Sequence, residues 1–83
     1  MNYITYIIYS KSLDRYYIGY TSDIEKRILR HNQKGKGFTG KANDWELVYK
    51  EVFLSKTAAY KREREIKSWK SRKSILELIG LRD

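Results

Sequence analysis

The chain has 83 residues, no cysteine and a formal net charge of +8 at pH 7. A chain of this length buries only about 60 to 65% of the surface that it exposes when unfolded, so we expect one domain, residues 1–83, with one modest core. The absence of cysteine excludes disulfides and thiolate metal sites and is compatible with a reducing compartment. The positive charge favours polyanionic partners, nucleic acid first, although it can also serve solubility alone.

No hydrophobic run approaches the roughly 18 residues that a membrane span requires. The first residues, Met1 to Tyr3, lack the basic segment of a secretory signal. The sequence also contains no proline, low-complexity segment or internal repeat, so it predicts no domain boundary. We therefore expect a cytoplasmic protein that does not interact with a membrane.

The chain is expected to begin with a β-hairpin. Residues 3–9 are β-branched and aromatic nearly throughout, which favours a strand covered on both faces. Residues 10–15 contain turn formers, and residues 16–20 repeat the chemistry of the first strand. The two segments should therefore pair in antiparallel fashion.

The register of this hairpin decides which tyrosines share a face, and the sequence does not fix it. If Ile8 lies opposite Tyr17, then Tyr6, Tyr17 and Gly19 point to the same side of the sheet. Glycine weakens a strand and often marks a close approach to the backbone, so a ligand could occupy the gap above Gly19. Most of the eight tyrosines are nevertheless expected to fill and edge the sheet.

A helix should follow the hairpin. Its start fits a capping box, in which the Ser22 hydroxyl accepts from the Glu25 amide while the Glu25 carboxylate reaches back. Its end is expected near Gly35, because glycine suits the left-handed position after a last helical turn. Residues 35–43 hold three glycines and several polar or basic residues, which indicates a mobile basic loop.

The rest of the chain predicts one more strand and two more helices. Apolar residues recur with a period of two through a third strand, at Trp45, Leu47, Tyr49 and Phe53. After Ser55, residues 56–69 favour a helix, and the apolar residues within 75–79 indicate a last helix that ends at Gly80. The expected order of elements is β-β-α-β-α-α.

Two polar residues of the first helix, Arg27 and His31, lie on its apolar side. At 100 degrees per residue they share that side with Ile24 and Ile28, which must face the sheet. A guanidinium in this position needs an anion, either a carboxylate of the protein or a phosphate of the substrate. An internal salt bridge for Arg27 and a hydrogen-bonded structural role for His31 are the alternatives.

In this order and spacing, the residues resemble a known family. The motifs are Thr5-Tyr6-Ile7, Tyr17-Ile18-Gly19, Arg27, His31, and Glu63 within Arg62-Glu63-Arg64-Glu65-Ile66-Lys67. From Tyr3 to about Ile79 the chain is similar to the GIY-YIG nuclease superfamily, especially its small stand-alone bacterial members and the N-terminal domain that makes the first incision in bacterial excision repair. The resemblance implies an α+β fold (an α/β sandwich) with a small three-stranded antiparallel sheet flanked by helices. It also implies divalent-metal-dependent endonuclease activity on DNA, in repair, recombination or the processing of DNA structures.

The resemblance further implies a role for each motif residue. Glu63 would be the single protein ligand of Mg²⁺ (or Mn²⁺), a hard cation that keeps most of its waters. Tyr17 is the candidate general base with Tyr6 nearby, and the family also allows the reverse assignment. Arg27 would clamp the scissile phosphate, and His31 would orient a tyrosine or contact that phosphate.

Some positions leave choices open or depart from the family pattern. The helical wheel does not show whether Glu63 or Glu65 would bind the metal, and only the match to the family motif favours Glu63. Some members carry lysine where this chain has Tyr20, the first motif has Thr5 in place of glycine, and residues 71–80 contain no asparagine.

Basic residues without an assigned catalytic role are candidates for contacts with the DNA backbone. They are Lys34, Lys36, Lys41, Lys67 and Lys70. Contacts of this kind give salt-dependent affinity with little sequence preference, although some of these side chains will be merely solvated. Two alternatives to a nuclease follow: a non-catalytic nucleic-acid-binding module of the same fold, and a protein-binding module with a relic site.

Overall fold

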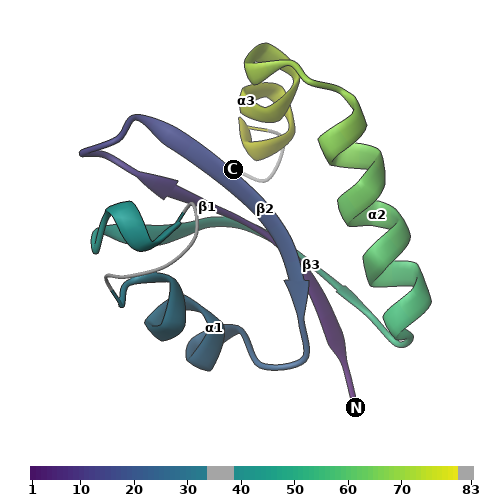
Figure 1. The fold of residues 1–83 in the computed structure, drawn as a ribbon. Helices are drawn as coiled ribbons and strands as arrows, with labels where there is room; N and C mark the ends of the chain where they lie inside the picture. Colours follow the sequence, from purple (N-terminus) through teal and green to yellow (C-terminus); the bar gives the residue numbers. More distant parts are fainter. Residues whose placement is uncertain (34–38, 81–83) are drawn as a thin grey trace.

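The computed structural model describes residues 1–33 and 39–80. Its elements are β1 (Tyr3–Ser10), β2 (Arg15–Thr21), α1 (Ile24–His31), a short 3₁₀ helix (Thr39–Lys41), β3 (Trp45–Phe53), α2 (Lys56–Ser68) and α3 (Arg72–Gly80). The strands form one antiparallel sheet in the order β2-β1-β3. The predicted α+β fold, with its order β-β-α-β-α-α, is confirmed (Figure 1).

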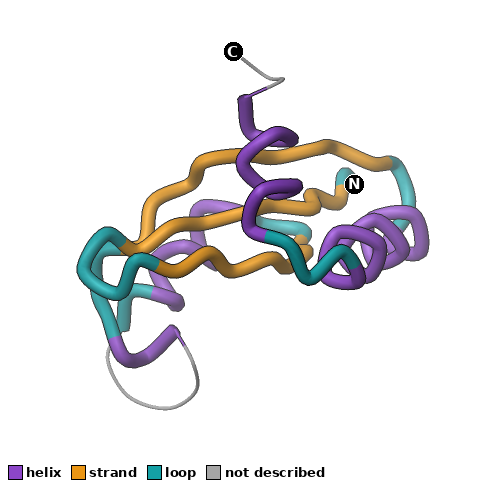
Figure 2. Tube along the Cα trace, turned by 90° about the horizontal axis from the view of Figure 1, so that it is seen from above, coloured by secondary structure: helices purple, strands orange, loops and turns teal. Residues whose placement is uncertain are grey.

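Helices cover both faces of the sheet, with α1 on one side and α2 and α3 on the other (Figures 1 and 2). The central strand β1 is therefore buried on both faces, as its apolar composition predicted. Tyr6 and Ile8 belong to the cluster under α1, and Ile7 belongs to the cluster under α2 and α3. Thr5 faces α2 and donates a buried hydrogen bond of 2.7 Å to the carbonyl of Ala59, which fixes α2 against β1.

The hairpin has the register that brings the two motif tyrosines to one face. Ile8 lies opposite Tyr17, and Tyr6 lies opposite Gly19. Directly opposed residues of an antiparallel pair point to the same side, so Tyr6, Tyr17 and Gly19 all belong to the α1 face. The sequence did not fix whether Ile8 lies opposite Tyr17, and the structure shows that it does.

Helix α1 begins one residue later than the predicted capping box. Its N-cap is Asp23, whose carboxylate accepts from the Lys26 amide at 3.1 Å, so the assignment to Ser22 was wrong. The preceding Thr21 decides the position, because its hydroxyl accepts from the Asp23 amide and donates to the Asp23 carbonyl. Ser22 is left exposed on the outside of this turn.

Helix α1 also ends earlier than predicted, at His31 and not near Gly35. The C-cap is Asn32, whose side-chain amide donates to the Trp45 carbonyl at 3.0 Å and accepts from the Trp45 amide at 2.7 Å. These two bonds pair the end of the helix with the start of β3, so His31 is held next to the sheet. Gly35 lies outside the described residues, as do residues 36–38 of the predicted basic loop, while Thr39–Lys41 of that loop form the short 3₁₀ helix.

Strand β3 contains a bulge that the alternating pattern did not predict. Ile7 lies opposite Tyr49 and Ile8 lies opposite Leu47, which leaves Val48 as an extra residue between them. The bulge reverses the side to which the following residues point. Trp45 therefore packs in the cluster under α1 and Tyr49 in the cluster under α2 and α3, so the prediction of one shared apolar face was wrong.

Helix α2 begins and ends close to its predicted bounds. Ser55 is the N-cap and accepts from the Ala58 amide at 3.1 Å. One side of the helix is tied to β3 by Arg62, which donates to the Glu51 carboxylate at 2.9 Å, and this carboxylate also accepts from the Tyr49 hydroxyl. Helix α3 extends from Arg72 to Gly80, the last described residue. Among the described residues, no helix is long and apolar enough to cross a membrane.

Candidate active site

Tyr6 of β1 and His31 of α1 form a buried hydrogen-bonded pair. The Tyr6 hydroxyl lies 2.7 Å from His31 Nε2, and the exposed fractions are 1% for Tyr6 and 7% for His31. Burial lowers the pKa of His31, and the charges of Arg27 and Arg30 lower it further, so the imidazole is neutral near pH 7. Burial also raises the pKa of Tyr6. A protonated tyrosine therefore meets a neutral histidine here.

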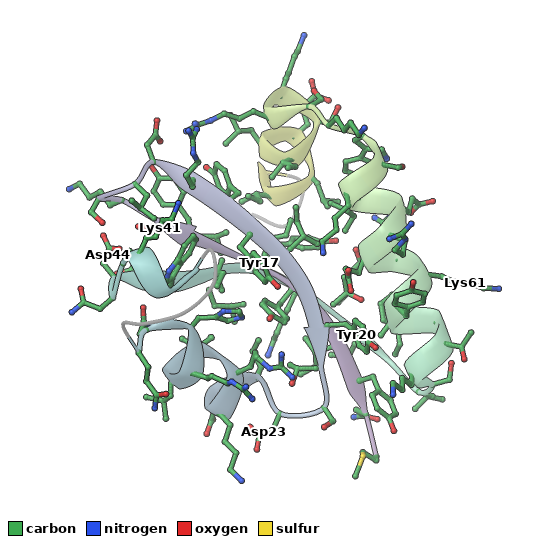
Figure 3. All side chains as sticks on the ribbon, viewed as in Figure 1. Tyr17, Tyr20, Asp23, Lys41, Asp44 and Lys61 are labelled. Carbon is green, nitrogen blue, oxygen red and sulfur yellow. The ribbon has the colours of Figure 1, made fainter. Side chains whose placement is uncertain are left out.

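Tyr17 of β2 completes an aromatic cluster around His31. Its ring centroid lies 4.9 Å from that of His31, and the Tyr6 ring lies 5.8 Å from the same imidazole. Tyr17 is more accessible than Tyr6, because it is only half-buried on an edge strand. Figure 3 shows Tyr17 near the centre of the molecule, between the helices that flank the sheet. Two hydroxyl-bearing rings thus contact one imidazole.

The space above Gly19 holds the Tyr6 side chain and not a ligand. A Cβ atom added to Gly19 would lie 2.6 Å from Tyr6 Oη, 2.8 Å from Tyr6 Cζ and 3.2 Å from Tyr17 Cε2. The expectation that a ligand fills this gap was therefore wrong. The glycine is needed because the two motif tyrosines pack directly against its backbone.

Arg27 is half-buried on α1, one turn before His31. The Arg27 charge lowers the pKa of Tyr6, whereas burial raises it. The ion pairs formed within residues 1–33 and 39–80 do not include Arg27. It lines two shallow hollows of about 690 and 460 Å³ on the surface. The guanidinium is thus accessible beside the aromatic cluster.

Glu63 and Glu65 of α2, between which the helical wheel did not choose, have different surroundings. Glu63 is buried, with 8% of its surface exposed, and its charge raises the pKa of Tyr6. Glu65 is exposed and pairs with Arg62 on the outer side of the helix. Only Glu63 is therefore electrostatically coupled to the tyrosine cluster.

Glu63 already has a cationic partner in Lys67, one turn further along α2. Lys67 Nζ lies 2.9 Å from Glu63 Oε1 and 5.7 Å from the centroid of the Tyr17 ring. Lys67 therefore lies beside the tyrosine cluster, although the sequence analysis predicted that it would contact the DNA backbone. The spacing of four residues was visible in the sequence as a standard helical ion pair.

The other lysines proposed for DNA contacts have no described contact with the cluster or are not described. Lys41 and Lys70 are exposed, and Lys34 and Lys36 lie outside the described residues. Lys56, at the start of α2, was not selected by the sequence analysis. It lines the hollow of about 460 Å³ together with Arg27. No motif marks Lys56, and only the packing of α2 against β2 brings it there.

Comparisons with known proteins identify the family of this chain. The family model of the GIY-YIG catalytic domain matches residues 2–75, so the chain belongs to the GIY-YIG family. Members of this family are nucleases that act on DNA and generally use divalent metal ions.

Among its relatives are small proteins named UPF0213. One from Staphylococcus saprophyticus is 48% identical over 65 residues, which are 77% of this chain and 78% of the relative. One from Bacillus pumilus is 37% identical over 67 residues, or 80% and 68% of the two chains. The solution NMR structure of a UPF0213 protein from Bacillus halodurans superposes with a TM-score of 0.60 at 32% identity, covering 98% of this chain and 85% of the other.

Proposed function

We propose that this protein is an endonuclease that hydrolyses DNA phosphodiester bonds with the help of Mg²⁺ or Mn²⁺. The observation that carries the proposal is the convergence of five motif residues from β1, β2, α1 and α2. His31 contacts the rings of Tyr6 and Tyr17, while the charges of Arg27 and Glu63 both act on the Tyr6 hydroxyl. Membership of a nuclease family supports the same conclusion.

Glu63 is the residue proposed to hold the metal ion. The part of the chain that the structure describes contains no group of three or more His, Asp and Glu residues that could enclose a cation. A single carboxylate still fits Mg²⁺, because this ion retains several waters and takes other ligands from substrate phosphates. When bound at Glu63, such an ion supplies positive charge to the departing 3′ oxygen.

Tyr17 is the proposed general base, and Tyr6 is the proposed partner of His31. Burial raises the pKa of Tyr6, so this hydroxyl keeps its proton and serves as a donor to the neutral imidazole. Tyr17 is half-buried and therefore more accessible to a water molecule. In the proposed step, a water oxygen bonds to phosphorus, the Tyr17 oxygen accepts the water proton, and the bond to the 3′ oxygen breaks with its electron pair left on that oxygen.

Arg27 is proposed to bind the scissile phosphate. The guanidinium carries a permanent charge, lines the hollows beside the cluster and forms no salt bridge within the described ranges. Negative charge grows on the phosphate oxygens as the water attacks, and a fixed guanidinium stabilises that charge. The anion that the sequence analysis required for Arg27 is, on this proposal, the substrate.

The test compares Glu63→Gln with Glu65→Gln, two isosteric changes on the same helix. Wild-type protein is incubated with flapped, branched, duplex and single-stranded DNA, with and without Mg²⁺, and DNA binding is measured separately. Glu63→Gln should reduce metal-dependent cleavage at least about 100-fold while DNA binding is retained. Glu65→Gln should cut like the wild type, because that carboxylate is exposed and paired with Arg62.

Equal cleavage by wild type and Glu63→Gln would overturn the assignment of Glu63. Salt-dependent binding without Mg²⁺-dependent cleavage by the wild type would overturn the nuclease itself and favour the non-catalytic binding module. The two outcomes are distinct, because the first concerns one residue and the second the activity of the intact site.

A further inference from the structure

A pair of aromatic rings connects the end of β2 with the start of α2. The Tyr20 and Tyr60 centroids lie 5.7 Å apart at an interplanar angle of 71°, an edge-to-face arrangement. Tyr60 has an exposed fraction of 45%, and Tyr20 is half-buried. Figure 3 shows Tyr20 between β2 and α2, on the side of the molecule that also carries Lys61. An aromatic surface is therefore open to solvent beside the second motif.

Two adjoining hollows run along this aromatic pair toward Arg27. The smaller, of about 210 Å³, is lined by Tyr20, Lys56, Thr57 and Tyr60. The larger, of about 460 Å³, is lined by Tyr3, Tyr20, Thr21, Ser22, Arg27 and Lys56. Tyr20 and Lys56 line both, so the two hollows adjoin at these side chains. Their described lining contains two cationic side chains and no carboxylate.

We propose that this surface binds one unpaired nucleotide next to the scissile phosphate. The inference rests on the proposed function, because Arg27 marks the position of that phosphate. The base stacks on the Tyr20–Tyr60 pair, and Lys56 lies where it can contact the phosphate of the same nucleotide. In a duplex the faces of the bases are covered by their neighbours, so only an unpaired base can use the rings.

The side chains that line the two hollows favour an unpaired nucleotide over other ligands. Aromatic rings accept any base through its π-face, and the cations beside them select for a polyanionic backbone. A purely apolar partner would leave Lys56 and Arg27 without a counter-charge, and an acidic peptide would not require the rings. A merely structural role for the pair, holding α2 against β2, is the competing explanation for Tyr20 and Tyr60.

The test measures DNA binding in EDTA by fluorescence anisotropy, so no cleavage takes place. The variants are Tyr60→Leu, which keeps an apolar side chain without a π-face, and Tyr60→Phe, which keeps the ring. Tyr60→Leu should weaken binding of a single-stranded oligonucleotide about tenfold, within the usual cost of removing a base-stacking aromatic. Tyr60→Phe should bind within about twofold of the wild type, and duplex binding should change in neither variant.

Leu76→Ala is the control, because Leu76 is as exposed as Tyr60 but lies on α3, away from these hollows. It should leave single-strand binding unchanged. A 2-aminopurine base in the oligonucleotide should lose fluorescence on binding to the wild type and less so on binding to Tyr60→Leu. Thermal unfolding of each variant measures how much Tyr60 contributes to holding α2 in place.

The proposal is overturned if Tyr60→Leu binds single strands as the wild type does, or weakens duplex binding equally. It is also overturned if Tyr60→Leu changes only the unfolding temperature, since a structural role would do that. Failure of the nuclease gives a different result. The wild type would then not cut DNA, while the dependence of single-strand binding on Tyr60, measured in EDTA, would remain.

Discussion

Lys67 Nζ lies 2.9 Å from Glu63 Oε1, so the carboxylate proposed to bind a metal ion is balanced by a cation of the same helix. The side chain of Glu63 is 10% exposed and that of Lys67 is 44% exposed. Without a metal ion, this pair provides the charge balance that a buried carboxylate requires. A cation that binds Glu63 therefore either displaces the Lys67 ammonium or lies close to it.

We expect Lys67→Met to bind Mn²⁺ more tightly while lowering stability in the absence of metal. Removal of the ammonium relieves a like-charge interaction with the metal, and we expect a gain in affinity of about fivefold, measured by electron paramagnetic resonance or calorimetry. The metal-free variant should lose roughly 1 kcal/mol in the free energy of unfolding, well below the value for a fully buried pair because Lys67 is partly solvated.

Lys61→Met is the matched control, because Lys61 is an exposed residue of the same helix and its side chain points away from the protein (Figure 3). It should change neither the Mn²⁺ affinity nor the stability appreciably. If Lys67→Met and Lys61→Met bind Mn²⁺ equally, Lys67 does not compete with a metal at Glu63.

Gly19→Ala should destabilise the protein by roughly 1 to 3 kcal/mol, the usual cost of overpacking a core. The added Cβ would come within 2.8 Å of two Tyr6 atoms, and this ring cannot move freely because its hydroxyl bonds to His31. Urea unfolding measures the loss. Gly80→Ala provides the comparison, since, among the described residues beyond its own helix and chain neighbours, no atom lies within 4 Å of its Cβ position. A loss at Gly19 no larger than at Gly80 would contradict the close packing of Tyr6.

The sequence predicted the elements of this fold well, because most of them follow from local patterns. The apolar run of β1 and the Ser55 cap of α2 required no knowledge of the tertiary structure. The bulge at Val48 was not predicted, because the sheet is covered on both faces, so apolar side chains before and after the extra residue are buried on either side. The start of α1 was missed by one residue, since Ser22 and Asp23 are both good cap residues and Thr21 decides between them.

The candidate site was predictable in composition but not in its contacts. The family motifs selected Tyr6, Tyr17 and His31, and their proximity required the hairpin register that the sequence left open. Helical periodicity could not separate Glu63 from Glu65, because burial depends on how α2 lies against the sheet. Lys56 and Tyr60 carry no motif, so only the tertiary structure connects them with Arg27 and Tyr20.

Tyr6→Phe should mainly lower the stability of the protein, whereas Tyr17→Phe should mainly lower the rate of DNA cleavage. Tyr6→Phe removes the buried 2.7 Å hydrogen bond between Tyr6 and His31, at a cost of about 1 to 3 kcal/mol. Tyr17→Phe removes the proposed proton acceptor, so the cleavage rate should fall about 100- to 10,000-fold. Urea unfolding and single-turnover cleavage at saturating protein measure the two effects.

The comparison assigns the base, because the two variants differ from the wild type by one oxygen each. If Tyr6→Phe loses more cleavage than Tyr17→Phe at a temperature where both are folded, the assignments must be exchanged. Tyr9→Phe is a control outside the site, since the Tyr9 hydroxyl bonds to the exposed Asp14 at the opposite end of the hairpin. It should cut DNA at the wild-type rate.

The stability of the protein should fall as the pH falls below about 6.5, because of His31. It is the single histidine of the chain, and burial, then Arg27 and Arg30, lower its pKa in the folded state. In the unfolded state its pKa is about 6.5. Between the two values the unfolded chain binds more protons than the folded protein, so acid favours unfolding. Above pH 6.5 this contribution is fully present.

Urea midpoints at pH 7.5 and pH 5.5 measure this effect in wild type and in His31→Gln. The wild type should have the lower midpoint at pH 5.5, and the difference between the two pH values should be smaller in His31→Gln, which has no imidazole to protonate. Carboxylates titrate mainly below this range and affect both proteins alike. The same pH dependence in both proteins would mean that His31 accepts a proton as readily in the fold as in the unfolded chain, against its burial beside Tyr6 and two arginines.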